Sequence, residues 1–149
     1  MAGKWQSGKL DKLIKGLKVV AQHEVAVGIV DKAYHVKSNG VATVAAIAQH
    51  LEDGPVGKKG KSWPVFRPGV KDAKYKGRMK GVIRDAMGGN AVAGLHRVGD
   101  VAANKIKTNI QGIKSPALEA STIKAKGSSN PLVDTGLTKS LVSYKIQRK

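Results

Sequence analysis

The hydrophobic residues near the start of the chain recur at helical spacing. Leu10, Leu13, Ile14 and Leu17 fall on one face of a helix, and the remaining faces carry Lys9, Lys12, Lys15 and Lys18. Such a division into an apolar and a charged face is typical of a helix that packs on a core at the protein surface. The pattern predicts an amphipathic helix within residues 1–22.

Two segments, one near each end of the chain, show the period of two residues that is typical of strands. From Val25 to Val30 the larger apolar residues alternate with small ones, and from Val142 to Ile146 they alternate with polar ones. Two prolines enclose the apolar pair at Val65 and Phe66, which favours an extended edge segment there. We expect both strands, together with the segment from Trp63 to Arg67, to form a small mixed sheet.

The remaining periodic segments read as helices. The helix that precedes Gly54 and Pro55 would end there, and the helix that precedes Gly127 would end at that glycine. The Gly, Pro and Lys composition of residues 54–62 predicts a flexible basic loop. The predicted helices cover residues 41–51, 71–87, 92–113 and 118–126, with a short one at 137–141. Together these elements predict an α+β fold, in which several helices pack a small mixed β-sheet within a single domain spanning residues 1–149.

Composition narrows the class of protein. Only 4% of the residues are aromatic while 41% are hydrophobic, so the core must consist mainly of Val, Ile, Leu and Ala. The chain has no cysteine, which excludes disulfides and thiolate metal sites. We find neither an apolar run long enough to span a bilayer nor a secretory leader, and therefore expect a soluble protein that is intracellular where it is made and has no membrane partner.

The charge indicates an anionic partner. The formal net charge is +17, from 27 Lys and Arg against 10 Asp and Glu, and a surplus of this size attracts nucleic acids or acidic proteins. Between residues 58 and 80 Asp72 is the single acid, so this segment suits contacts with phosphates, although a solvated basic helix face would look the same. The candidate contacts are Lys58, Lys59, Lys61, Arg67, Lys71, Lys74 and Arg78.

Two aromatic residues lie inside this basic segment. Trp63 and Phe66 are candidate anchors that would fix the extended segment either to the core or to a neighbouring subunit. Stacking on bases is the alternative role for such side chains among lysines.

Motifs for catalysis are weak in this sequence. Asp134, Thr135 and Gly136 match the short signature of aspartic proteases, which would require a dimer with two such aspartates. The residues after this triplet, 137–141, have helical rather than strand periodicity. We therefore interpret Asp134 or Thr135 as the N-terminal cap of the helix at 137–141. The four histidines lack metal-ligand spacing, and no nucleotide-binding loop is present. The sequence therefore predicts a protein that is not an enzyme and needs no cofactor or metal.

Three segments resemble the phage tail-completion and head–tail joining family that includes minor tail protein Z. They are VATVAAIAQHLEDG at residues 41–54, WPVFRP at 63–68 and SPALEASTIKAKGSSNPLVDTGLTKS at 115–140, in the order and spacing of that family. With the flanking strands the resemblance covers residues 24–146, and the third segment is the most specific.

The resemblance implies a structural virion protein. Such a subunit is assembled in the host cytoplasm, forms a homo-oligomeric ring with a hexamer as the expected stoichiometry, and joins the tail to the filled head. Its partners would be other neck and tail proteins and the packaged double-stranded DNA inside the ring. The high net charge by itself supports an alternative function, that of a free accessory protein which binds DNA without recognising a particular sequence.

Overall fold

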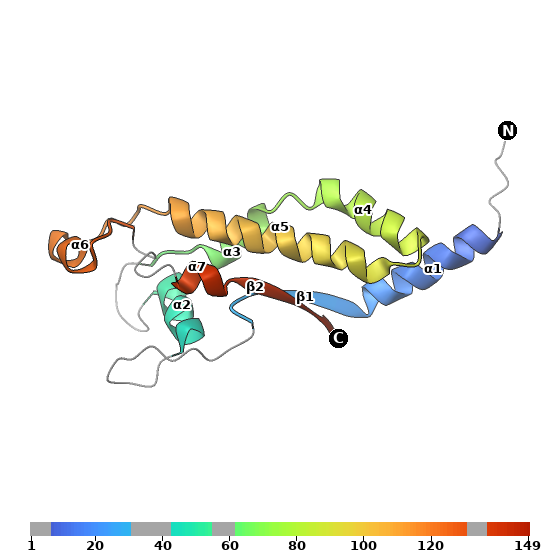
Figure 1. The fold of residues 1–149 in the computed structure, drawn as a ribbon, viewed down its shortest axis with the longest axis horizontal. Coiled ribbons are helices and arrows are strands. Elements are labelled where there is room, and N and C mark those ends of the chain that lie inside the picture. Colours follow the sequence, from blue (N-terminus) through green and yellow to red (C-terminus); the bar gives the residue numbers. More distant parts are fainter. Residues whose placement is uncertain (1–6, 31–42, 55–61, 131–136) are drawn as a thin grey trace.

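The computed structural model describes residues 7–30, 43–54, 62–130 and 137–149. The molecule is elongated, and a long helix, α5, forms its central part, with α6 beyond one end and α1 beyond the other (Figure 1). The elements in chain order are α1 (Ser7–Ala21), β1 (His23–Gly28), α2 (Val44–Asp53), α3 (Phe66–Asp72), α4 (Lys76–Met87), α5 (Ala91–Gly112), α6 (Ala120–Lys126), α7 (Leu137–Leu141) and β2 (Ser143–Arg148).

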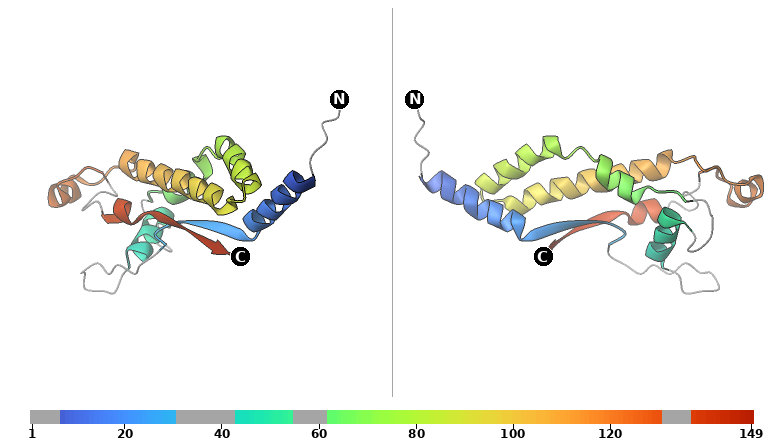
Figure 2. Two further views of the ribbon diagram at one scale, coloured as in Figure 1. Left: turned by 45° about the vertical axis from the view of Figure 1, so that its right-hand side comes forward. Right: turned by 180° about the vertical axis from the view of Figure 1, so that it is seen from behind.

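Helix α5 is the centre of the fold. Helix α4 lies along one side of it and the two strands lie along the opposite side (Figure 2). Ile106 and Ile110 of α5 are fully buried and pack with Val65 and Val142 in the main core cluster. The prediction of a long helix over residues 92–113 with a buried aliphatic stripe is confirmed, as is the α+β fold class.

The sheet in the described part of the chain is a two-stranded antiparallel ribbon. Strand β1 pairs with β2 in a register that sets Val25 opposite Ile146 and Val27 opposite Tyr144. A two-stranded ribbon is marginal by itself, so its contact with α5 supplies the stability that further strands would give. Both strands were predicted, whereas the prediction of a mixed sheet is wrong for the described residues.

The segment from Trp63 to Arg67 is not an edge strand, which corrects the second part of that prediction. Residues 62–65 have no regular secondary structure, and α3 begins at Phe66. Pro68 is the third residue of α3, where its missing N–H costs little because the first turn of a helix has no internal partners for these groups. The two prolines therefore lie on either side of a helix start, Pro64 before it and Pro68 in the first turn.

The predicted helix over residues 71–87 is two helices. Ala73 has an extended backbone with φ −63° and ψ 128° and a buried methyl group, and it ends α3 before α4 starts. Each helix then meets α5 closely, since Gly69 of α3 lies against Ile106 and Val82 of α4 lies against Gly94. The local sequence contains no Gly or Pro at the break, so the pattern gave no sign of it.

The N-terminal helix packs across the end of α4. A Cβ atom on Gly16 would lie 2.7 Å from the carbonyl carbon of Ala86, so the two backbones are in close contact there. The amphipathic helix predicted within residues 1–22 is confirmed as α1. No helix in the described residues is long and apolar enough to cross a bilayer.

The C-terminal third agrees with the sequence pattern. Helix α6 starts at Ala120, slightly later than predicted, and ends at Lys126; the next residue, Gly127, has φ 68°, the left-handed conformation typical of a helix stop. Helix α7 leads directly into β2, as expected. The predicted loop at residues 54–62 lies mostly outside the described residues, and so does the proposed cap at Asp134 and Thr135.

Candidate functional site

A buried carboxylate holds the joint between α2 and α3. The side chain of Glu52, near the end of α2, accepts hydrogen bonds from the backbone N–H groups of Val65 at 2.6 Å, Phe66 at 2.9 Å and Arg67 at 2.9 Å. Glu52 is only 8% exposed, so these charge-assisted bonds form away from water, where they are strong. Since the N-cap residue Val65 has no capping side chain of its own, Glu52 caps α3 from thirteen residues earlier in the chain.

Further hydrogen bonds join this segment to other parts of the chain. The backbone N–H of Trp63 donates to the carbonyl of Leu51 at 2.7 Å, and its indole Nε1 donates to the carbonyl of Pro116 at 2.8 Å. The Nδ2 of Asn109 on α5 donates to the carbonyl of Val65 at 3.3 Å. The approach to α3 is therefore bonded to α2, to α5 and to the segment that precedes α6.

The same region is fastened to the end of α5. The side chain of Asn130, beyond α6, donates through Nδ2 to the carbonyls of Ile110 at 3.1 Å and Gln111 at 2.9 Å. These carbonyls belong to the last turn of α5, which has no internal partners for them. The chain before and after α6 is thus tied back to the body of the molecule.

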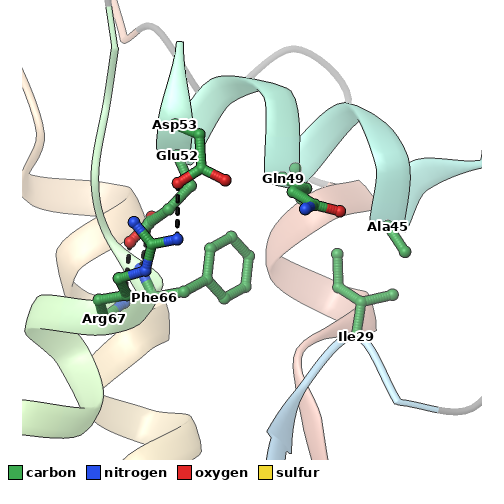
Figure 3. A pocket seen from close by; sticks show the side chains of 8 residues that line it. Ile29, Ala45, Gln49, Glu52, Asp53, Phe66 and Arg67 are labelled. Atoms are coloured by element: carbon green, nitrogen blue, oxygen red, sulfur yellow. Dashed lines mark hydrogen bonds and ion pairs between the residues drawn. The ribbon is translucent and has the colours of Figure 1, made fainter. Parts of the chain in front are cut away.

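A surface hollow of about 340 Å³ lies beside this joint. The ring of Phe66 and the side chain of Ile29 approach it from different segments, and the face of α2 with Ala45 and Gln49 forms another wall (Figure 3). Arg67 forms an ion pair with Asp53 at 2.7 Å at its edge. The hollow has an apolar floor and a charged edge, which suits an apolar side chain of a partner protein with a polar group beside it.

The structure places the predicted basic residues as follows. Arg67, Lys71, Lys74 and Arg78 are exposed on α3, α4 and the turn between them. Arg67 is already paired with Asp53, so its charge is partly neutralised, although its side chain is 76% exposed. Lys58, Lys59 and Lys61 lie outside the described residues, as do Asp134 and Thr135.

Trp63 and Phe66 both lie at the joint. They are half-buried and pack against the core cluster around Ile106 and Val142. The predicted attachment of the extended segment to the core is therefore confirmed, while a role at a subunit interface stays a prediction.

The sequence pattern gave no indication of the role of Glu52. Its capping role depends on residues far along the chain, and no local motif marks it. A second unpredicted cluster joins α5 and β2, where the Tyr144 hydroxyl lies 3.2 Å from Nδ1 of His96. Burial, followed by the charge and hydrogen bond of Asp100, raises the pKa of Tyr144. Within the described ranges, no three His, Asp or Glu side chains gather as metal ligands would.

Comparison with known proteins gave no match: no family model, no curated protein and no solved structure is significantly similar to this chain. Any functional assignment therefore rests on the residues and the geometry described above.

Proposed function

We propose that this chain is a structural virion protein of the phage neck, which completes the tail and joins it to the head as a subunit of a hexameric ring around the DNA. One observation carries the proposal. The third of the segments that resemble the tail-completion family is far from the other two in sequence, yet the described parts of all three are bonded together at one end of the molecule.

Hydrogen bonds link all three segments directly. Glu52, from the first segment, caps the helix that starts in the second, and Trp63, from the second, donates to Pro116 in the third. A chance resemblance would be expected to fall on unrelated surfaces. A shared assembly surface, in contrast, would require these segments to lie together, and the hydrogen bonds between them support the proposal in this way.

The surface next to this joint suits contact with a second protein subunit. The hollow beside Phe66 offers an apolar floor, and the ion pair of Arg67 with Asp53 offers both signs of charge at its edge. In a closed ring each subunit uses two different patches, so a neighbour would fill this hollow with a surface of another kind. The exposed basic residues of α3 and α4 then remain available for DNA or for an acidic neck protein.

The test measures the mass of the assembly and its place in the particle. Light scattering after size-exclusion chromatography should give the mass of a hexamer for the full chain, and mass spectrometry should find the chain in virions of the phage that encodes it. Phe66→Glu should reduce the assembly to monomers, because it places a charge in the hollow. Val70→Glu, on the same helix and at an exposed position, should leave the ring intact. A chain that is monomeric at every concentration and absent from virions would overturn the proposal.

The exposed lysines and arginines of α3 and α4 also support the alternative of a free DNA-binding accessory protein. In that case binding to duplex DNA should weaken steeply with salt, and each of Lys71→Gln, Lys74→Gln and Arg78→Gln should reduce the slope of log K against log salt by about one. Tight DNA binding by a chain that never enters virions would favour this alternative. Weak binding at physiological salt would exclude it.

A further inference from the structure

Helix α1 presents a row of large apolar side chains to solvent. Leu10, Ile14 and Leu17 are 44%, 43% and 42% exposed, although they form the apolar face that the sequence pattern assigns to the core. Scattered exposed leucines are common, but a continuous row along one helix is characteristic of a surface that another molecule covers.

The chain itself uses a different side of α1. Gly16 is the residue in close contact with α4, and Val19 and Val20 are half-buried near the end of the helix. Figures 1 and 2 show that α1 extends past the ends of α4 and α5, at the opposite end of the molecule from α6. The exposed row is therefore accessible and lies far from the α2–α3 joint.

The spacing of the row fits one partner helix. Leu10, Ile14 and Leu17 are four and then three residues apart, which is the a/d repeat of a coiled-coil seam. Leucine occupies the two d positions and isoleucine the a position between them, the arrangement that favours two helices side by side. Leu13, the fourth apolar residue of this face, is half-buried, so the exposed part is narrower than the apolar face of a helix that lies in a membrane surface.

Charge decides what kind of helix fits. Helix α1 carries Lys9, Lys12, Lys15 and Lys18 against the single acid Asp11, so it attracts an acidic partner. A second copy of this chain would bring the same lysines together. The other exposed large apolar residues among those described are on α3 and α4, where basic residues outnumber the two acids Asp72 and Asp85, so they offer no predominantly acidic face: Val70, Met79, Ile83 and Met87.

We propose that α1 is the docking site for an acidic amphipathic helix of a different protein, which packs on the row of Leu10, Ile14 and Leu17. The proposal does not depend on the assignment to the phage neck. A neck subunit and a free DNA-binding protein would both be able to recruit a partner through this helix.

The experiment uses the full chain and synthetic helical peptides of several heptads. One peptide has an Ile and Leu seam flanked by glutamates, and a second has the same seam flanked by lysines. Isothermal calorimetry should detect the acidic peptide and not the basic one, and hydrogen exchange should show added protection in α1. Ile14→Asn should weaken binding at least ~10-fold, because it places a polar group in the seam. Val70→Asn, at an exposed apolar position on α3, is the matched control and should bind normally.

Three outcomes would overturn the proposal. Equal binding of both peptides would mean that charge does not select the partner. Self-association that Ile14→Asn removes would mean that a second copy covers the row. Binding to vesicles that contain phosphatidylserine, in preference to the acidic peptide, would mean that α1 lies on a membrane surface. Circular dichroism and urea unfolding of Ile14→Asn confirm that any loss of binding is not a loss of folding.

Discussion

Gly99 of α5 lies directly beneath the aromatic ring of Tyr144 on β2. A Cβ atom on Gly99 would lie 2.5 Å from Cγ of that ring, closer than real side chains approach one another. Gly99 is buried, and the missing side chain allows the strand to lie against the middle of the long helix. The glycine that interrupts the apolar stripe of α5 is therefore part of the contact between helix and sheet.

Gly99→Ala should destabilise the fold by about 1–3 kcal/mol, because the added methyl group forces the ring of Tyr144 and its strand away from α5. Urea unfolding monitored by circular dichroism measures this loss. Tyr144→Ala should remove most of the effect in a double-mutant cycle, since the methyl group then has space.

Gly77 in α4 provides the matched control, because a Cβ atom there would have no neighbour within 4 Å. Gly77→Ala should raise the free energy of unfolding by roughly 0.5–1 kcal/mol through its better helix propensity. Similar destabilisation at both positions would show that close approach to Tyr144 does not matter.

Glu52→Ala should be among the most damaging single changes in α2. It leaves three backbone N–H groups at the start of α3 without their acceptor, that of Val65 in a buried position, and we expect a loss of about 2–4 kcal/mol in the free energy of unfolding. Glu52→Gln should lose less, because the amide oxygen still accepts a hydrogen bond. Thermal unfolding by calorimetry distinguishes the two variants.

The neighbouring acid tests whether this effect belongs to the cap. Asp53→Asn removes only the exposed ion pair with Arg67, so it should change stability by less than about 1 kcal/mol. Equal losses at positions 52 and 53 would argue that general electrostatics, and not capping of α3, stabilises the joint.

Gly16→Val should detach α1 from α4, because a larger side chain cannot fit against the backbone of Ala86. Hydrogen exchange followed by mass spectrometry should show lost protection in α1 while the centre of α5 remains protected. Gly8→Val is the control for helix propensity, since nothing lies within 4 Å of its Cβ position. Unchanged protection of α1 in Gly16→Val would contradict the packing described here.

The ionisation of Tyr144 should occur above its ordinary pKa of 10.0, because burial and the Asp100 carboxylate both disfavour the phenolate. The neutral phenol therefore stabilises the folded state fully below about pH 10. This contribution is lost as the pH rises through the higher folded pKa. Nuclear magnetic resonance of the ring Cζ gives the midpoint, and Asp100→Asn should lower it. An unchanged midpoint in Asp100→Asn would mean that burial alone raises the pKa of Tyr144.

The helices α1, α2, α5 and α7 and both strands could be predicted from the sequence, because their signals are local. The period of apolar residues reports which side of a helix or strand is buried, and Gly54 and Gly127 mark helix ends through their backbone freedom. The predicted basic residues Lys71, Lys74 and Arg78 were likewise found exposed, as the composition of their segment suggests.

Only the tertiary structure decided where α3 begins and which side of α1 is used. The start of α3 depends on a carboxylate from α2, and a hydrogen bond across thirteen residues leaves no periodic trace in the sequence. The sequence pattern correctly shows the apolar row of α1, but this row is exposed, and Gly16 is the residue of α1 that is buried against α4. Two backbones can approach most closely where no side chain separates them. The sequence by itself therefore determined the elements and their apolar faces. Long-range contacts decided how those faces are used and which of them remains open to a partner.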